Sequence, residues 1–376
     1  MKKLAAATVL LFSSMTFGGH EVGNGGDVVL CRSTSDLQPS VELLDFYEAR
    51  TLRGITHTLG PANQPFLEKV ETAIARLDSI SPARANRYRA QASTFMSDSI
   101  FLPGVILTDV PDSANVALPV GCTIEQIAIQ KEPQFPEDKR YTISKDLWDQ
   151  LDEDGKAGLV LHEIIFREAL GFYHETSIST RYINSYIAAD KLQGLTQKDF
   201  IRFLDRAKFR ETDIMGCSIE TAEFRQGPHG TYASGLTFYE SGTVNVAPAR
   251  RGCLIDVPYI SGGTAGGVGN PSAFHFHESG YLKKFGTYNA VYERGAVKFQ
   301  ISNHCQINLY PSRQVEVLCV GETVSLLFQD GSMKEVEKGR RVKFDENGAV
   351  ISVSESSCEM RSCGDGDDNG DIEAAK

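Results

Sequence analysis

The chain has 376 residues, of which 41% are hydrophobic and 23% charged, and its formal net charge is −11. This composition excludes a disordered chain and a fibrous repeat, and the acidic balance offers little to the phosphates of a nucleic acid, so we expect no nucleic-acid partner. At roughly 100–200 residues per domain, the length predicts about two domains.

The amino terminus has the pattern of a secretory signal. Lys2 and Lys3 precede an apolar run from Leu4 to Phe12, which is about the length of a signal-peptide core. A transmembrane helix needs about 20 apolar residues, and Ser13 interrupts the run well before that. We expect residues 1–19 to be a signal peptide and the mature protein to be exported, periplasmic or extracellular, without a transmembrane anchor.

Export decides how the eight cysteines are interpreted. None of them forms a C-x-x-C pair, so a zinc ribbon or a thioredoxin-type motif has little support, and disulfides are the expected use in an oxidising compartment. The candidates are Cys31, Cys122, Cys217, Cys253, Cys305, Cys319, Cys358 and Cys363. Grouping by region suggests Cys31 with Cys122 and Cys358 with Cys363.

Residues 20–228 are predicted to form a helix-rich α+β domain. Apolar residues recur at helical spacing in two stripes, Phe66, Val70, Ile74 and Leu77, and Phe200, Leu204 and Ala207. Thr196 lies three residues before Asp199, the spacing of a helix N-cap. The apolar segments 27–31, 100–107 and 127–130 are predicted strands beside these helices.

Residues 229–355 are predicted to form an antiparallel β-hairpin repeat domain. The pattern strand, glycine-containing turn, strand recurs at Leu236–Val244, Phe274–Leu282 and Val342–Val350, with a shorter turn at Leu326–Met333 and a weaker copy at Val297–Ile307. These units resemble MORN-like β-repeats of bacterial surface and secreted proteins, although an ordinary antiparallel β-domain also accounts for them. We take His275 and His277 as exposed strand residues rather than a metal pair.

The segment from Ala157 to Gly171 is predicted to be a buried helix because it is apolar almost all the way round. Its His162–Glu163 pair resembles the first half of the zincin motif His-Glu-x-x-His, in which two histidines hold zinc and the glutamate is the general base. Phe166 stands where the second histidine would be. A zinc site would therefore need His162, His174 and a carboxylate such as Glu168 or Glu175, with Glu163 as the catalytic base. Zinc is the one cofactor that the sequence leaves open.

A structural polar cluster is the other interpretation of the same residues. Glu163 and Arg167 are four apart and can pair along the helix. His162 would donate to a carboxylate or a carbonyl, and Arg181 would supply a second cation. This cluster would satisfy the buried polar groups without any catalysis.

A wider resemblance covers roughly the first 190 residues. The segments Gly23–Cys31, Val41–Glu48, Gly121–Cys122 and Leu147–Trp148 resemble an uncharacterised family of exported proteins from Gram-negative bacteria. Members of that family carry His-Glu-x-x-aromatic, followed by a histidine and a serine before an arginine-bearing helix. The matching positions here are His162, Glu163, Phe166, His174, Ser177 and Arg181. The resemblance implies a zincin-like scaffold without zinc, or an unusual site, and carries no established activity.

Residues 356–376 form an acidic tail that we expect to be disordered. Asp365–Ile372 matches the first eight positions of an EF-hand loop, but Lys376 stands where the loop needs a bidentate glutamate. We therefore expect no calcium at the tail.

Two functions follow from these patterns. The first is a non-catalytic exported envelope or surface protein whose β-repeats bind a partner protein or an envelope component. The second is a zinc-dependent, peptidase-like hydrolase that uses the His162–Glu163 helix. The sequence leaves open whether the protein is an enzyme.

Overall fold

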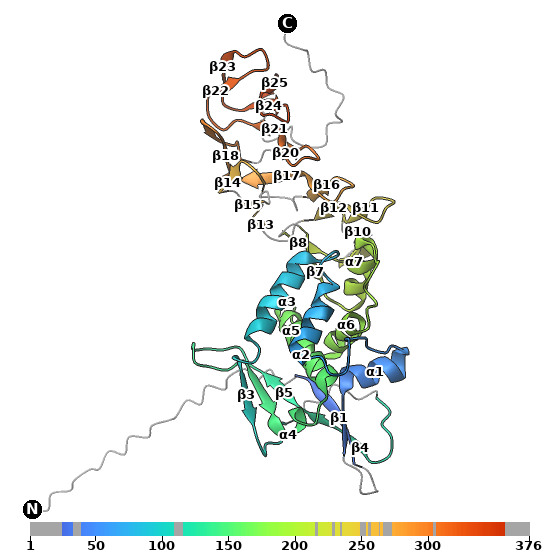
Figure 1. Ribbon diagram of the computed structural model, residues 1–376. Coiled ribbons are helices and arrows are strands. Elements are labelled where there is room, and N and C mark those ends of the chain that lie inside the picture. The colour runs from blue at the N-terminus through green and yellow to red at the C-terminus, as the bar shows by residue number, and fades with distance from the viewer. Residues whose placement is uncertain are drawn as a thin grey trace, which may run out of the picture.

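A computed structural model describes residues 25–32, 39–108, 116–214, 217–227, 230–233, 235–248, 253–254, 257–262, 264–265, 273–303 and 306–357. The predicted signal peptide, the pair Cys358 and Cys363, and the acidic tail from residue 358 onward lie outside these residues, whereas Ser356 and Ser357, which we placed in the tail, end a strand. Figure 1 shows an elongated molecule in which helices gather in the amino-terminal half and strands in the carboxy-terminal half. The predicted α+β class is confirmed.

The helices lie between two small sheets at one end of the chain and the hairpin array at the other (Figure 1). The elements of this half are β1 (Asp27–Cys31), β2 (Ser40–Leu43), α1 (Leu44–Arg53), α2 (Phe66–Ala75), α3 (Pro82–Thr94), β3 (Ser99–Leu102), β4 (Cys122–Gln126), β5 (Ala128–Gln130), β6 (Tyr141–Ser144), α4 (Lys145–Trp148), α5 (Glu153–Gly171), α6 (Ile178–Ala188) and α7 (Gln197–Arg206).

Helix α5 is the centre of the amino-terminal core. The Asp152 side chain caps its first turn by accepting from Gly155 N–H at 2.7 Å, so the helix begins four residues before the predicted apolar segment. Its residues from Leu159 to Phe166 are fully buried, and the helix packs against α1, α2, α3 and α6. A hydrophobic helix surrounded in this way places its few polar side chains in the protein interior.

The sheets of this half follow the sequence predictions in part. Strand β1 is central in the antiparallel order β2-β1-β4, and β6 is central in the order β3-β6-β5, where β3 and β6 are parallel. The strand predicted at 100–107 ends at Leu102. A disulfide joins Cys31 and Cys122 on neighbouring strands, which confirms that predicted pair.

The carboxy-terminal half consists of hairpins. Its elements are β7 (Glu211–Ile214), β8 (Cys217–Glu220), β9 (Phe224–Gly227), β10 (Gly230–Ala233), β11 (Thr237–Phe238), β12 (Val244–Pro248), β13 (Cys253–Leu254), β14 (Ile260–Ser261), β15 (Thr264–Ala265), β16 (Ala273–Phe276), β17 (Leu282–Tyr288), β18 (Val291–Arg294), β19 (Val297–Gln300), β20 (Gln306–Leu309), β21 (Val315–Cys319), β22 (Val324–Leu327), β23 (Met333–Val336), β24 (Arg340–Phe344) and β25 (Val350–Ser357).

One ten-stranded sheet runs through this half in the order β11-β12-β16-β17-β20-β21-β24-β25, with β13 and β15 off this path. Because neighbouring strands on the path are antiparallel, the turns of its four hairpins all lie along one end of the sheet. The hairpins β18–β19 and β22–β23 belong to separate small sheets, and their buried residues share one core with the large sheet. The strands begin at Glu211, and residues 228 and 229, where we placed the domain boundary, lie outside the described residues.

The hairpin predictions are confirmed at Leu236–Val244, Phe274–Leu282, Val342–Val350 and Leu326–Met333. The copy at Val297–Ile307 is wrong, because β19 pairs with β18 while Ile307 belongs to β20 and pairs with β17. Sequence reasoning missed the hairpin β20–β21 because Arg313, with φ 70°, occupies the turn position that glycine holds in the other units. No helix in the described part of the chain is long and apolar enough to cross a membrane.

Candidate functional site

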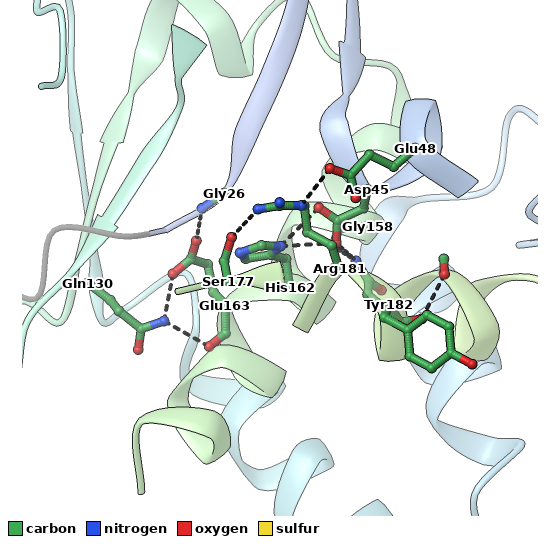
Figure 2. A network of polar contacts seen from close by, with 12 residues as sticks. Gly26, Asp45, Glu48, Gln130, Gly158, His162, Glu163, Ser177, Arg181 and Tyr182 are labelled. Carbon is green, nitrogen blue, oxygen red and sulfur yellow. Dashed lines mark hydrogen bonds and ion pairs between the residues drawn. The ribbon is translucent and has the colours of Figure 1, made fainter. Parts of the chain in front are cut away.

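The polar residues of α5 lie in a buried network that four other parts of the chain complete (Figure 2). His162 and Glu163 are both fully buried. Their direct partners come from the segment before β1, from α1 and from β5, and α6 donates to the α1 carboxylate, so the network connects segments that are far apart in sequence.

His162 is held by a carboxylate from α1. Its Nδ1 lies 3.0 Å from both carboxylate oxygens of Asp45. The Asn184 amide donates to Asp45 Oδ2 at 2.6 Å and to the Gly158 carbonyl at 2.9 Å. His162 Nε2 is buried and has no hydrogen-bond partner among the described residues. The imidazole is therefore fixed through one nitrogen only.

Glu163 is held by the amino-terminal segment and by β5. Gly26 N–H donates to Glu163 Oε1 at 2.7 Å, and the Gln130 amide donates to Oε2 at 2.9 Å. A Cβ atom at Gly26 would lie 2.1 Å from Leu159 Cδ1 of α5, and one at Gly25 would lie 2.1 Å from the Ala128 carbonyl oxygen of β5. Glycines therefore let the backbone pass this close to α5 and β5.

The charges in this network shift one another's pKa. Burial disfavours the imidazolium, but the Asp45 carboxylate outweighs burial and raises the pKa of His162 to about 9. Burial raises the pKa of Glu163 to about 7 against the opposing effects of His162 and the Gly26 hydrogen bond. Burial would also raise the pKa of Asp45, but His162 and Asn184 together lower it. At neutral pH the centre of the network is an imidazolium–carboxylate pair.

A second pair lies beside the first. The Arg181 guanidinium donates from Nε to Glu48 Oε1 at 3.1 Å and from Nη1 to Ser177 Oγ. Of the predicted polar cluster, His162, Glu163 and Arg181 thus lie in one network, each with a partner that we did not predict. The predicted Glu163–Arg167 pair is absent from the ion pairs among the described residues, because the Glu163 carboxylate turns to Gly26 and Gln130 instead.

The proposed zinc ligands do not come together. Glu168 accepts from Arg84, Arg87 and Tyr88, and His174 Nε2 lies 2.9 Å from the Lys208 carbonyl oxygen. Phe166 is buried in the hydrophobic core. Within the described ranges, no three His, Cys, Asp or Glu side chains form a group that could hold a metal ion. Glu168 and His174 thus hold other partners and do not converge on His162.

Sequence reasoning missed Asp45, Asn184 and Gln130. One signal was available: Asp45 and Glu48 lie one helical turn apart within the otherwise apolar stretch Leu43–Ala49, and carboxylates at buried positions need partners. Asn184 and Gln130 carry no comparable signal, because their partners lie 139 and 33 residues away.

Comparison with known proteins adds no relative. No family model, curated protein or solved structure matches the chain.

Proposed function

We propose that this is an exported envelope or surface protein whose hairpin array binds a partner, with the helical half as its scaffold. One observation supports the proposal. Four hairpins of one sheet present equivalent turns along one end of the sheet, and side-chain contacts to the backbone join each hairpin to the next. We call this set of turns (residues 239–243, 277–281, 310–314 and 345–349) the turn row; its first turn also contacts α7, so the other three turns are the ones open to a partner.

The bridges repeat from hairpin to hairpin. The Tyr239 hydroxyl donates to the Phe276 carbonyl at 2.7 Å, His277 Nε2 lies 2.9 Å from the Leu309 carbonyl oxygen, and the Tyr310 hydroxyl donates to the Phe344 carbonyl at 2.7 Å. Each bridge joins the first turn residue of one unit to the last strand residue before the next turn. His277 is therefore a half-buried bridging residue, whereas we expected an exposed one.

The turn row suits a binding surface. Its turns are two strands apart, or roughly 10 Å at about 4.8 Å per strand. A rigid array loses little conformational entropy when it binds. In the middle of the row Tyr281 is 45% exposed and lies under the Arg313 guanidinium, 6.0 Å from the ring centroid. Tyrosine and arginine are the residue types that most often dominate binding energy at interfaces.

A photo-crosslinking experiment tests this function. A benzophenone amino acid at Ser279 or Ser312 should give a discrete crosslinked product in Gram-negative cells that export the protein, and the same group at exposed Glu335 on β23 should not. Tyr281→Ala with Arg313→Ala should reduce the product about 30-fold or more, since together they lose contacts worth about 2 kcal/mol or more. Equal crosslinking from Glu335, or none from the turn row, would contradict the proposal.

The zinc-dependent hydrolase is the second candidate, and one observation favours it. His162 Nε2 is buried without a partner while a carboxylate holds Nδ1, which is the arrangement of many zinc-bound histidines. The other proposed donors are engaged elsewhere, as described above. Metal analysis of the purified protein separates the two functions: stoichiometric zinc that is lost in His162→Ala would favour the hydrolase, and a folded, metal-free protein would count against it.

A further inference from the structure

The last hairpins of the array leave an exposed apolar patch. In the β22–β23 hairpin, Leu327 pairs across the strands with Met333, and the two residues are 47% and 59% exposed. Phe328 forms a bridge with Val350, which brings Ile351 of β25, 39% exposed, beside this hairpin. We call Leu327, Met333 and Ile351 the end patch. Exposed apolar side chains that lie together mark a contact surface.

The two ends of the hairpin array differ. Figure 1 shows α7 at one end of the array and β22–β25 at the other. At the first end, Ile201 of α7 is buried in the hairpin core, and Lys198 N–H donates to the Gly242 carbonyl at 2.9 Å. At the last end, the end patch stays exposed. Because the terminal units of a repeat array need a cover to stay soluble, we expect something to bind there.

The rim of the end patch carries one charge of each sign. Lys334 Nζ lies 3.2 Å from Asp330 Oδ2, and the two side chains are 49% and 58% exposed. In a twofold contact each residue of one copy meets the same surface on the other copy, so the lysine of each copy can face the aspartate of its partner. A strongly acidic or strongly basic partner would meet one unfavourable charge at the same rim. The charges therefore favour a second copy of the chain.

From these observations we infer that the end patch joins two copies of the chain in a twofold dimer. Since α7 closes the first end, copies cannot add head to tail, and contact between two last ends gives a closed dimer rather than a fibre. An end face as long as the eight-residue β25 and two sheets thick measures roughly 500 Å² per copy. The dimer then buries about 1,000 Å² in total, the lower limit for a specific interface, and we expect a micromolar dissociation constant.

The last residues of the chain itself are the alternative cover. Residues 358–376 contain six acidic residues, and Met360 and Ile372 are their only large apolar ones. A segment of this composition has little apolar surface to place on the end patch. A second end patch matches the first in both its apolar surface and its charges.

Two pairs of variants separate the end patch from the rest of the surface. Met333→Asp places a charge in the patch, and Met96→Asp is its matched control, because Met96 is a 42% exposed methionine in the helical half. Lys334→Glu reverses a charge at the rim. Lys145→Glu is its control, because Lys145 forms an exposed pair with Asp149 at the same spacing of four residues. Circular dichroism checks that each variant keeps the wild-type fold.

The test is sedimentation equilibrium of the full mature protein from about 1 µM to about 100 µM. We expect a monomer–dimer equilibrium that Met333→Asp weakens about tenfold or more and that neither control variant changes. Lys334→Glu should weaken the dimer at low salt and less at about 1 M salt, because salt screens exposed charges. The inference is overturned if the protein stays monomeric at the highest concentration, or if Met333→Asp and Met96→Asp have equal effects.

A benzophenone amino acid at Met333 identifies what covers the end patch. We expect a crosslinked product of twice the mass of the chain. A crosslink to residues 358–376 within one chain would instead show that the tail is the cover and overturn the inference. A product of twice the chain's mass from Glu335, two residues along β23, belongs to the dimer and not to the partner of the turn row, so the two proposals can fail separately.

Discussion

His162 and Asp45 form an ion pair that is completely removed from solvent. The desolvation of two charges is costly, and a buried pair recovers this cost only through close contact and further hydrogen bonds. Asn184 supplies such a bond to Asp45, and Gln130 and Gly26 supply two to Glu163. Since each partner comes from a different element, the pair fixes how α1, α5 and α6 pack.

The pH dependence of stability should follow from these groups. The pKa of His162 is raised from 6.5 to about 9, so its stabilisation is complete below pH 6.5 and is lost as the pH rises through 9. The pKa of Glu163 is raised from 4.5 to about 7, so its burial as a neutral acid favours folding below pH 4.5 and this contribution falls as the pH rises to 7. Both effects make the folded protein less stable at higher pH.

We therefore expect the free energy of unfolding of the helical half to fall between pH 5 and pH 9. Urea denaturation followed by the fluorescence of Trp148 measures this half alone, because the chain has one tryptophan. The change due to His162 is roughly 3 kcal/mol at about 1.4 kcal/mol per pKa unit. His162→Gln should remove the slope above about pH 7, where the titration of Glu163 is largely complete; a variant that keeps this slope would show that another group titrates.

At the scale of elements, the turns of the hairpin array share one backbone pattern. In the β16–β17 turn, His277 N–H donates to the Tyr281 carbonyl and Gly280 N–H donates back to the His277 carbonyl, and the β20–β21 turn repeats this with Tyr310, Gln314 and Arg313. The fourth residue of each turn has a positive φ, which is 86° at Gly280 and 70° at Arg313. The positive φ favours glycine at this position, but arginine can occupy it where the neighbouring hairpin holds the turn in place.

The bridges between hairpins should contribute measurably to stability. Tyr310→Phe removes the donor to the Phe344 carbonyl, and we expect a loss of about 1 kcal/mol, the usual worth of such a bond. Hydrogen exchange of the β24 amides should become faster in this variant. Tyr281→Phe is the control, because it keeps the exposed ring on Arg313 and should change stability by less than about 0.5 kcal/mol. Equal effects of the two variants would show that the Tyr310 bridge does not hold the array.

At the scale of the whole molecule, the first hairpin turn joins the two halves. Lys198 N–H at the start of α7 donates to the Gly242 carbonyl at 2.9 Å, and Val244 N–H donates to Gln197 Oε1 at 3.1 Å. Ile201 of α7 is buried in the core of the hairpin half. The helix that Thr196 caps is therefore shared between the two halves.

Gly242→Ala should weaken this junction. A Cβ atom there would lie 2.7 Å from Thr196 Oγ1, and φ is 83°. Gly280→Ala is the matched control, since its φ is 86° but a Cβ atom meets open space. Alanine at either position destabilises the fold by about 1 kcal/mol or more, because a positive φ is unfavourable for it. Only Gly242→Ala should separate the unfolding of the two halves. Trp148 fluorescence and circular dichroism should then give different unfolding midpoints. Coincident midpoints in Gly242→Ala would contradict this view of the junction.

Local patterns were enough to predict much of this protein. The period of apolar residues placed α2 and α7, the hydrophobicity of all faces placed α5, and repeated strand-turn-strand segments placed four hairpins. These features could be predicted because they depend on residues close in sequence. The Cys31–Cys122 disulfide could also be predicted, because few cysteines lie in that half of the chain. The β20–β21 hairpin could not be predicted, because its turn has Arg313 in place of glycine and depends on the neighbouring hairpin.

The candidate site could not be predicted in the same way. The sequence determined that α5 is buried and that His162 and Glu163 enter the interior with it. Only the tertiary structure decided their partners, because Asp45, 117 residues away, and Gly26, 137 residues away, reach α5 through the packing of other elements. It also decided that Glu168 and His174 turn elsewhere, and that Leu327, Met333 and Ile351 meet at one end of the hairpin array. Burial is encoded in local hydrophobicity, whereas the pairing of buried charges is a property of the packed fold.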